Sequence, residues 1–184
     1  MRRLIGIATI ALITIFAMTS QSAAVDLENT LYLELKTGRV VIEMRPDIAP
    51  KHVKRIKELV REKFYDGLKF HRVIPGFMAQ TGDPKGDGTG GSGQNIPAEF
   101  TNLESFYRGT VGMARAQNPN SADSQFFITY APSQWLDGQY TIWGEVIDGM
   151  EYVDAIKKGS ESNNGLVTDP DKIITLRVAA DVKK

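Results

Sequence analysis

The residues best suited to chemistry lie in one stretch, from Phe70 to Asp83, which reads Phe-His-Arg-Val-Ile-Pro-Gly-Phe-Met-Ala-Gln-Thr-Gly-Asp. It combines one guanidinium, on Arg72, and one amide, on Gln80, with two phenylalanines and a methionine. The chain has no cysteine, which excludes thiolate nucleophiles, disulfides and cysteine metal sites. A charged, amide-lined apolar face without a nucleophile can bind a peptide, or catalyse a reaction that needs no covalent step.

A β-hairpin is the element that must position these two polar groups. Pro fixes φ at the first corner of a turn and Gly accepts positive φ at the second, so Ile74-Pro75-Gly76-Phe77 predicts a type II turn. A two-residue loop would put Arg72 and Gln80 on opposite faces. A three-residue loop pairs Arg72 with Gln80 and Ile74 with Met78, and gathers all four side chains on one face. We favour the three-residue loop, which leaves the other face to His71, Val73, Ala79 and Thr81.

Other chemistries find little support in the sequence. The two histidines, His52 and His71, lack the spacing of a metal site, and no nucleophile elbow accompanies them. His52 falls on the polar face of a predicted helix, where we expect a solvated surface side chain. The glycine-rich stretch 82–93 lacks both the Gly-Lys-Ser/Thr ending of a P-loop and the twelfth-position carboxylate of a calcium loop. We therefore predict a tight surface loop there.

The remaining pattern indicates many short strands and two helices. Alternating apolar residues over 31–44 are typical of a hairpin with one buried face. Pro50 begins a helix whose apolar residues recur at helical spacing, and a second helix is expected over 150–156. There is no βαβ rhythm and no internal repeat, and closure into a barrel would remove exposed edges. Further strands are expected at 107–114, 124–129, 140–146 and 174–178.

The charge balance argues against nucleic acid as a partner. The 184 residues contain 22 basic and 22 acidic side chains, and neither a basic stripe nor a block of like charge is present. The length is sufficient for one domain with a substantial core. We expect a monomer.

The first 24 residues are typical of a secretory signal peptide. Arg2 and Arg3 provide a positive start, Leu4 to Met18 is apolar apart from two threonines, and Ser22-Ala23-Ala24 offers small residues to a signal peptidase. As a helix the apolar run would cover roughly 22 Å, less than a ~30 Å hydrocarbon core. We therefore expect cleavage after Ala24 and a mature domain of residues 25–184 that is periplasmic or secreted, with no membrane attachment.

The stretch from Phe70 to Asp83 resembles the signature of the cyclophilins, which are peptidyl-prolyl cis-trans isomerases. Three further blocks agree in order and spacing, and the resemblance as a whole extends over essentially all of the chain after residue 24. These blocks are Gly88-Thr89-Gly90-Gly91, Gly112-Met113-Ala114 through Ser124-Gln125-Phe126-Phe127-Ile128, and Trp135-Leu136-Asp137-Gly138. The resemblance implies a mainly β fold: a closed eight-stranded antiparallel β-barrel capped by two α-helices, with its site on the outer face.

The resemblance also implies roles for individual residues. Arg72 would be the catalytic residue, and Gln80 would orient it and meet the substrate backbone. The family's proline pocket is matched by Phe77, Met78, Phe127, Leu136 and Tyr140. The positions that hold the flanking peptide are matched by Ala114, Arg115, Ala116 and Gln125, with His71 beside them. Backbone groups of the flanking positions would pair with the peptide as an added strand does.

Two departures from the family pattern change the expected groove. Many cyclophilins have His where this chain has Tyr140, which keeps an aromatic wall and a hydroxyl. Many have Asn where this chain has Arg115, which adds a charge. Trp135 stands where the indole N–H of sensitive members binds cyclosporin, so the resemblance implies cyclosporin binding here.

The expected function is an exported prolyl isomerase that acts on proline-containing polypeptides without cofactor or metal. The alternative from another class is a non-catalytic module on the same fold that binds proline peptides or acts as a chaperone. Loss of the arginine would favour that alternative, and Arg72 is present. A hydrolase would need a nucleophile responsive to serine-directed inhibitors, and we expect none.

Overall fold

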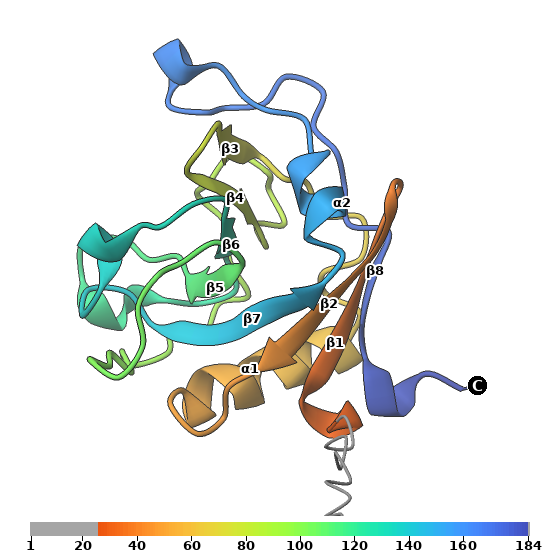
Figure 1. Ribbon diagram of the computed structural model, residues 1–184, viewed down its shortest axis with the longest axis vertical. Coiled ribbons are helices and arrows are strands. Elements are labelled where there is room, and N and C mark those ends of the chain that lie inside the picture. The colour runs from red at the N-terminus through yellow and green to blue at the C-terminus, as the bar shows by residue number, and fades with distance from the viewer. Residues whose placement is uncertain (1–25, 184) are drawn as a thin grey trace, which may run out of the picture.

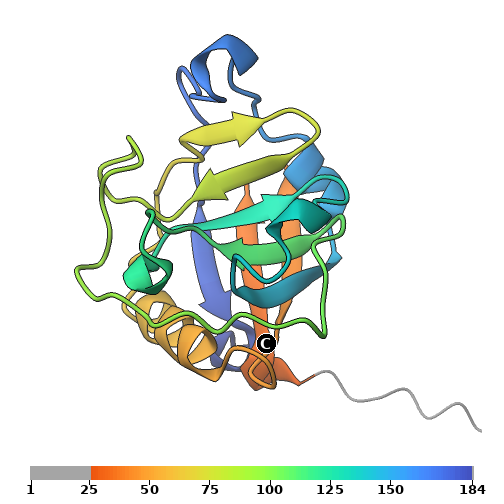
Figure 2. The ribbon, with the colours of Figure 1, turned by 90° about the vertical axis from the view of Figure 1, so that its left-hand side faces the viewer.

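A strongly curled antiparallel sheet dominates the computed structural model, which describes residues 26–183 (Figures 1 and 2). The described residues form eight strands in the spatial order β3-β4-β6-β5-β7-β2-β1-β8. The strands are β1 (Thr30–Leu35), β2 (Gly38–Met44), β3 (Arg72–Ile74), β4 (Met78–Thr81), β5 (Thr110–Met113), β6 (Phe126–Thr129), β7 (Ile142–Asp148) and β8 (Thr175–Val178). The α-helices are α1 (Pro50–Arg61) and α2 (Met150–Asp154). The signal peptide predicted for residues 1–24 lies outside the described residues.

The sheet closes on itself through the segments that precede its two edge strands, β3 and β8. The Gly67 N–H donates to the Ile173 carbonyl at 2.8 Å, and the Ile173 N–H donates to the Leu68 carbonyl at 2.9 Å. A further bond joins the Phe70 N–H to the Asp171 carbonyl at 2.9 Å. The predicted fold class, a mainly β barrel with two helices, is confirmed.

The hairpin that carries the chemistry has the predicted register. Arg72 pairs with Gln80, and Ile74 pairs with Met78 across β3 and β4. Gly76 has φ of 68°, the positive value that the turn requires of its second corner. Arg72 and Gln80 therefore share one face of the hairpin, as the three-residue loop predicts.

Two apolar clusters lie on opposite faces of the same strands. Phe126 and Ile128 of β6 point into the barrel, where they pack with Trp143 and other fully buried side chains. Phe127, between them, belongs to a second cluster outside the barrel, together with Met78 and other residues. Because side chains alternate along a strand, the three consecutive apolar residues from Phe126 to Ile128 contribute to both clusters.

Helix α1 covers one end of the barrel with the apolar face that its sequence predicts. Val53, Ile56 and Val60 are buried, and Leu59 joins them. Pro50 is the first residue of the helix, where its missing N–H costs little. Within the described part of the chain, no helix is both long and apolar enough to span a bilayer.

The prediction that His52 is a solvated surface residue is wrong. Its side chain is fully buried, because the extended segment around Glu99 lies across the start of α1. Glu99 accepts hydrogen bonds from the N–H groups of Lys51 and His52, each at 3.0 Å, and its Oε2 lies 2.6 Å from His52 Nδ1. Ala49, the residue before the helix, supplies no side-chain cap, so this distant carboxylate does so. Burial lowers the pKa of His52, against the opposing effect of Glu99.

Candidate active site

The second apolar cluster lines a cavity of about 660 Å³ on the outer face of the barrel, the outer pocket. Its floor is aromatic: the Phe127 ring stacks on Phe106 at 5.7 Å and meets Tyr140 edge-on at 5.8 Å. Gly112 allows this stacking, since a Cβ there would lie 2.6 Å from an atom of each phenylalanine ring. The remaining apolar walls are Phe77, Met78, Trp135, Leu136 and Leu166.

Arg72 is one of the charged groups at this apolar pocket, which Asp87 and Arg115 also border. Its Nη1 donates to Gln80 Oε1 at 3.1 Å, while its Nε and Nη2 donate to the main-chain and side-chain oxygens of Asn164, each at 3.0 Å. Burial lowers the pKa of Arg72, but a guanidinium stays protonated in proteins. The guanidinium of Arg72 is therefore an oriented, permanent positive charge beside an apolar surface.

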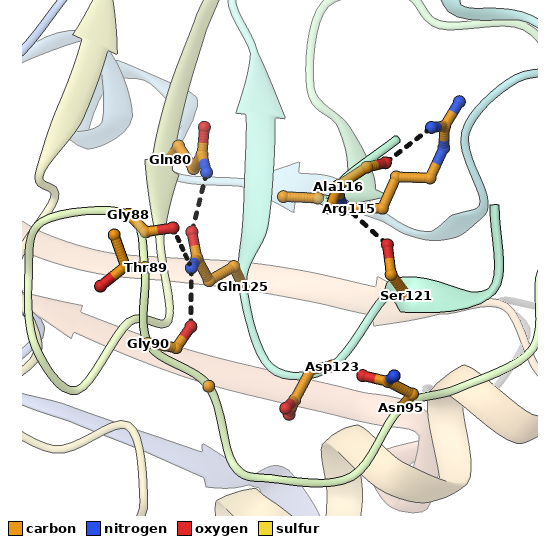
Figure 3. A pocket seen from close by; sticks show the side chains of 12 residues that line it. Gln80, Gly88, Thr89, Gly90, Asn95, Arg115, Ala116, Ser121, Asp123 and Gln125 are labelled. Atoms are coloured by element: carbon orange, nitrogen blue, oxygen red, sulfur yellow. Dashed lines mark hydrogen bonds between the residues drawn. The ribbon is translucent and has the colours of Figure 1, made fainter. Parts of the chain in front are cut away.

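A chain of amide hydrogen bonds continues from Arg72 to the glycine-rich loop. Gln80 Nε2 donates to Gln125 Oε1 at 2.9 Å, and Gln125 Nε2 donates to the carbonyls of Gly88 and Gly90, at 3.0 and 2.8 Å (Figure 3). Each amide thus accepts on the side of Arg72 and donates away from it. This polarity fixes the Gln80 oxygen toward the guanidinium of Arg72.

The glycine-rich stretch 82–93 is a loop, as predicted, but it is also one wall of the site. The loop folds around Asp83, which is 1% exposed and accepts hydrogen bonds from the N–H groups of Lys85, Asp87 and Gly88. Burial alone would raise the pKa of Asp83, but these donors hold it below its usual value. The role of this stretch as a wall depends on its contacts with Gln125, which the local sequence does not indicate.

A second hollow of about 320 Å³, the side pocket, opens between the glycine loop and the residues after β5 (Figure 3). It shares Gln80, Gly88, Thr89, Ala114 and Arg115 with the outer pocket, so the two form one continuous groove. The Ala114 N–H is bonded to the Gln125 carbonyl and the Ala116 N–H to Ser121 Oγ, each at 2.9 Å. These two backbone N–H groups therefore already have partners within the protein.

The guanidinium of Arg115 is held flat against the groove. It lies 4.6 Å from the centre of the Tyr140 ring and donates to the carbonyls of Gln139 and Ala116 at 2.9 Å. Such cation–π contacts favour arginine over the face of an aromatic ring. The two positions at which the chain departs from the family pattern are thus in contact with each other.

All thirteen predicted site residues border one of the two pockets, although they come from distant parts of the sequence. Eleven border the outer pocket, and Ala116 and Gln125 border the side pocket. His71, the residue before β3, is 3% exposed, and burial lowers the pKa of its ring. Trp135 is 62% exposed and lies 5.5 Å from the Phe77 ring. Within residues 26–183, no group of three or more potential metal ligands is present.

Comparison with known proteins identifies the class. Residues 30–178 match the family described as cyclophilin type peptidyl-prolyl cis-trans isomerase/CLD. A probable peptidyl-prolyl cis-trans isomerase of Brucella suis is 55% identical, over 99% of this chain and 98% of that protein. The human peptidyl-prolyl cis-trans isomerase-like 1 is 40% identical, over 78% of this chain and 89% of that protein.

Solved structures agree with the sequence comparison. The cyclophilin AquaCyp293 of Hirschia baltica superposes with a TM-score of 0.76 at 28% identity, covering 86% of this chain and 77% of that chain. A Cryptosporidium parvum cyclophilin, crystallised in the presence of the dipeptide Ala-Pro, gives a TM-score of 0.75 at 30% identity, covering 81% and 98%. The chain belongs to the cyclophilin-type peptidyl-prolyl cis-trans isomerase family. Its activity is isomerisation of X-Pro peptide bonds, and proline-containing peptides are its substrates.

Proposed function

We propose that the protein isomerises X-Pro bonds of exported polypeptides outside the cytoplasm, with Arg72 as the catalytic residue. The observation that carries the role of Arg72 is its place at the edge of an apolar pocket: a charged fork held by Gln80 lies beside Phe77, Met78 and Phe127. The proline ring occupies the apolar part, and the flanking chain follows the continuous groove past Ala114 to the side pocket.

The electronic structure of the amide explains why a guanidinium accelerates this rotation. The barrier of roughly 18–20 kcal/mol comes from resonance, which draws the lone pair of the proline nitrogen into the C–N bond. In the twisted transition state the lone pair returns to nitrogen and can accept a hydrogen bond. An N–H of Arg72 donates to it there and has no equivalent acceptor in either planar state, so the binding energy acts on the barrier.

The apolar walls also favour the twisted transition state over the planar states. They exclude water from the proline ring, which strengthens the interaction between the guanidinium and the nitrogen lone pair. No bond is made or broken, so no nucleophile, proton relay or cofactor is required. Catalysis requires only that the guanidinium of Arg72 is held against the proline nitrogen.

The test is NMR exchange of an Ala-Pro peptide with the chain from Val25, compared with Arg72→Ala. We expect the exchange rate of bound peptide to fall about 100- to 1000-fold, the usual cost of losing one preorganised donor. Arg39→Ala, on the exposed face of β2, is the matched control and retains the full rate. Equal rates for Arg72→Ala and its parent would contradict the proposed mechanism.

The proposal of export rests on the leading segment. An N-terminal pair of arginines, an apolar run and the small residues up to Ala24 form the pattern that a signal peptidase processes. The full chain should be expressed in a Gram-negative host, and mass spectrometry of the periplasmic and medium fractions should find protein that begins at Val25. Protein that retains Met1 and stays in the cytoplasm would reject export and leave the isomerase assignment intact.

We also propose that cyclosporin binds through Trp135. The ring is exposed beside Phe77, so its N–H can reach a ligand that covers the outer pocket. Inhibition of isomerisation by cyclosporin should weaken in Trp135→Ala, while exchange without inhibitor changes little. Tyr140→His, which restores the common family residue, should tighten inhibition, and unchanged inhibition in both variants would refute this contact.

A further inference from the structure

Asn164, a residue that the sequence analysis did not single out, supplies two of the three hydrogen bonds that hold Arg72. It lies 92 positions further along the chain. Its backbone carbonyl accepts from Nε and its Oδ1 accepts from Nη2, each at 3.0 Å. Both acceptors therefore engage one edge of the guanidinium fork, the bidentate arrangement that orients an arginine most strongly.

The position of Asn164 is fixed by a segment that adds to the outer edge of β3, residues 159–167, here named the clamp segment. The Gly159 N–H donates to the Val73 carbonyl at 2.9 Å, and the Val73 N–H donates to the Gly165 carbonyl at 2.7 Å. The Val167 N–H donates to the His71 carbonyl at 3.0 Å. This connection after α2, blue in Figures 1 and 2, runs beside β3, so Asn164 is attached to the same strand as the arginine that it holds.

The local conformation explains why asparagine suits this place. Asn164 is left-handed, with φ of 51° and ψ of 33°, and its own N–H bonds back to Glu161 at 3.2 Å. Asparagine tolerates this conformation better than other side chains apart from glycine, and it also carries an oxygen acceptor. Gly165 follows with φ of 76° and packs against Ile74, where a Cβ would lie 2.5 Å from Cγ1.

Some N–H groups of Arg72 have no partner in the clamp segment or on Gln80. A guanidinium has five N–H donors in a rigid fork. Three are engaged, two by Asn164 and one by Gln80. Within residues 26–183, one N–H on each terminal nitrogen remains without a partner, and Arg72 borders the outer pocket.

We propose that Asn164 is a positioning residue for the isomerase: its two oxygens lock the Arg72 fork so that the remaining terminal N–H groups face the proline nitrogen. This inference rests on the proposed catalytic role of Arg72. Gln80 alone would leave the fork free to swing about one hydrogen bond. With Asn164, the guanidinium is held by acceptors on two of its edges, at Nε and Nη2 by Asn164 and at Nη1 by Gln80.

The experiment measures peptide affinity and bound-state exchange separately, by NMR titration and line shape, for Asn164→Gly and Asn164→Asp. Glycine keeps the left-handed backbone and its carbonyl but removes Oδ1, and aspartate keeps an oxygen in the same place. We expect Asn164→Gly to slow exchange about tenfold, or ~1.4 kcal/mol in the barrier, with peptide affinity within threefold of the parent. Asn164→Asp should stay within threefold of the parent in both quantities.

Two controls separate positioning from a structural role. Asp169→Gly replaces another left-handed residue of the same connection, away from the pockets, and should leave exchange unchanged. In an Arg72→Ala background, Asn164→Gly should have no further effect, because nothing is left to position.

The outcomes distinguish the inference from the proposal beneath it. Full exchange in Asn164→Gly, with Arg72→Ala still slow, would overturn the role of Asn164 alone. Tenfold slower exchange in both the parent and the Arg72→Ala background would also overturn it, since the residue would then act through the fold. An active Arg72→Ala would reject the catalytic role of Arg72, and the positioning role would fail with it.

Discussion

The barrel interior and the outer-face cluster are built from the same strands, yet they differ in how complete their packing is. Inside, Phe126 meets Trp143 and Tyr65 edge-on, and all three side chains are fully buried. Outside, Phe127 stacks on Phe106, but one side of the cluster opens into the outer pocket. The interior is closed by the protein itself, whereas the outer cluster leaves an opening, which the proline ring fills under the proposed function.

This difference predicts that one residue of β6 affects mainly stability and its neighbour mainly peptide affinity. These are the largest effects that we expect. Phe126→Ala should lower the free energy of unfolding by about 3–5 kcal/mol, because it leaves a cavity inside a closed core. Phe127→Ala should cost less stability, since water can fill the opened space, but should weaken Ala-Pro peptide binding at least tenfold. Urea unfolding and NMR titration of both variants test this, and equal stability losses with equal affinities would break the comparison.

Two glycines provide a second comparison between the outer pocket and a closed part of the sheet. Gly112→Ala should push the Phe127 ring into the outer pocket, costing about 1–3 kcal/mol of stability and also reducing peptide affinity. Gly144→Ala crowds the Glu43 carbonyl between β7 and β2, where a Cβ would lie 2.9 Å from the oxygen, and should cost stability alone. Denaturation and peptide titration separate the two, and unchanged affinity in Gly112→Ala would refute the role given to this close approach.

A smaller effect is expected at the start of α1. Glu99→Gln weakens the acceptor for the N–H groups of Lys51 and His52, so we expect a loss of about 1 kcal/mol, typical of a helix cap. Peptide affinity should stay unchanged, because these contacts lie outside both pockets. Glu62→Gln, at the exposed C-cap of the same helix, is the control, and an equal loss there would indicate a general charge effect.

The smallest predicted effect is a pH dependence of stability. Burial holds the pKa of His52 below the 6.5 of an unperturbed histidine. Between these two values the unfolded chain binds more protons, so the contribution of His52 is complete above pH 6.5 and is lost as pH falls below it. His52→Gln should therefore lose less unfolding free energy between pH 7.5 and 5.5 than its parent. Parallel losses in the two proteins would contradict this.

Local pattern predicted those parts of the structure that depend on neighbouring residues. The register of Arg72 with Gln80 follows from a turn and strict alternation, and the apolar face of α1 follows from helical spacing. The burial of His52 could not follow, because the residue that covers it, Glu99, is 47 positions away. The spacing of apolar residues predicts which face of one helix or strand is buried, but it does not indicate which loop covers that element.

The same limit applies to the site. The four matching blocks include twelve of the thirteen site residues, and Tyr140 lies two positions beyond the last block. All thirteen border the two pockets, but no block includes Asn164. Its contact with Arg72 joins strand β3 to a connection near the end of the chain. The one local signal is the Asn164-Gly165 pair, a dipeptide typical of tight left-handed turns. It predicts a turn but cannot indicate which side chain the turn will meet.

The closed edges of the sheet have a consequence for an enzyme whose substrates are proline-containing peptides. An extended peptide can pair with the free backbone groups of an open sheet edge, which would hold it away from the groove. Here residues 159–167 pair with the outer edge of β3, and the Ile173 backbone before β8 pairs with Gly67 and Leu68. Under the proposed function, a peptide therefore binds in the groove around Arg72 and not as an added strand at either of these edges.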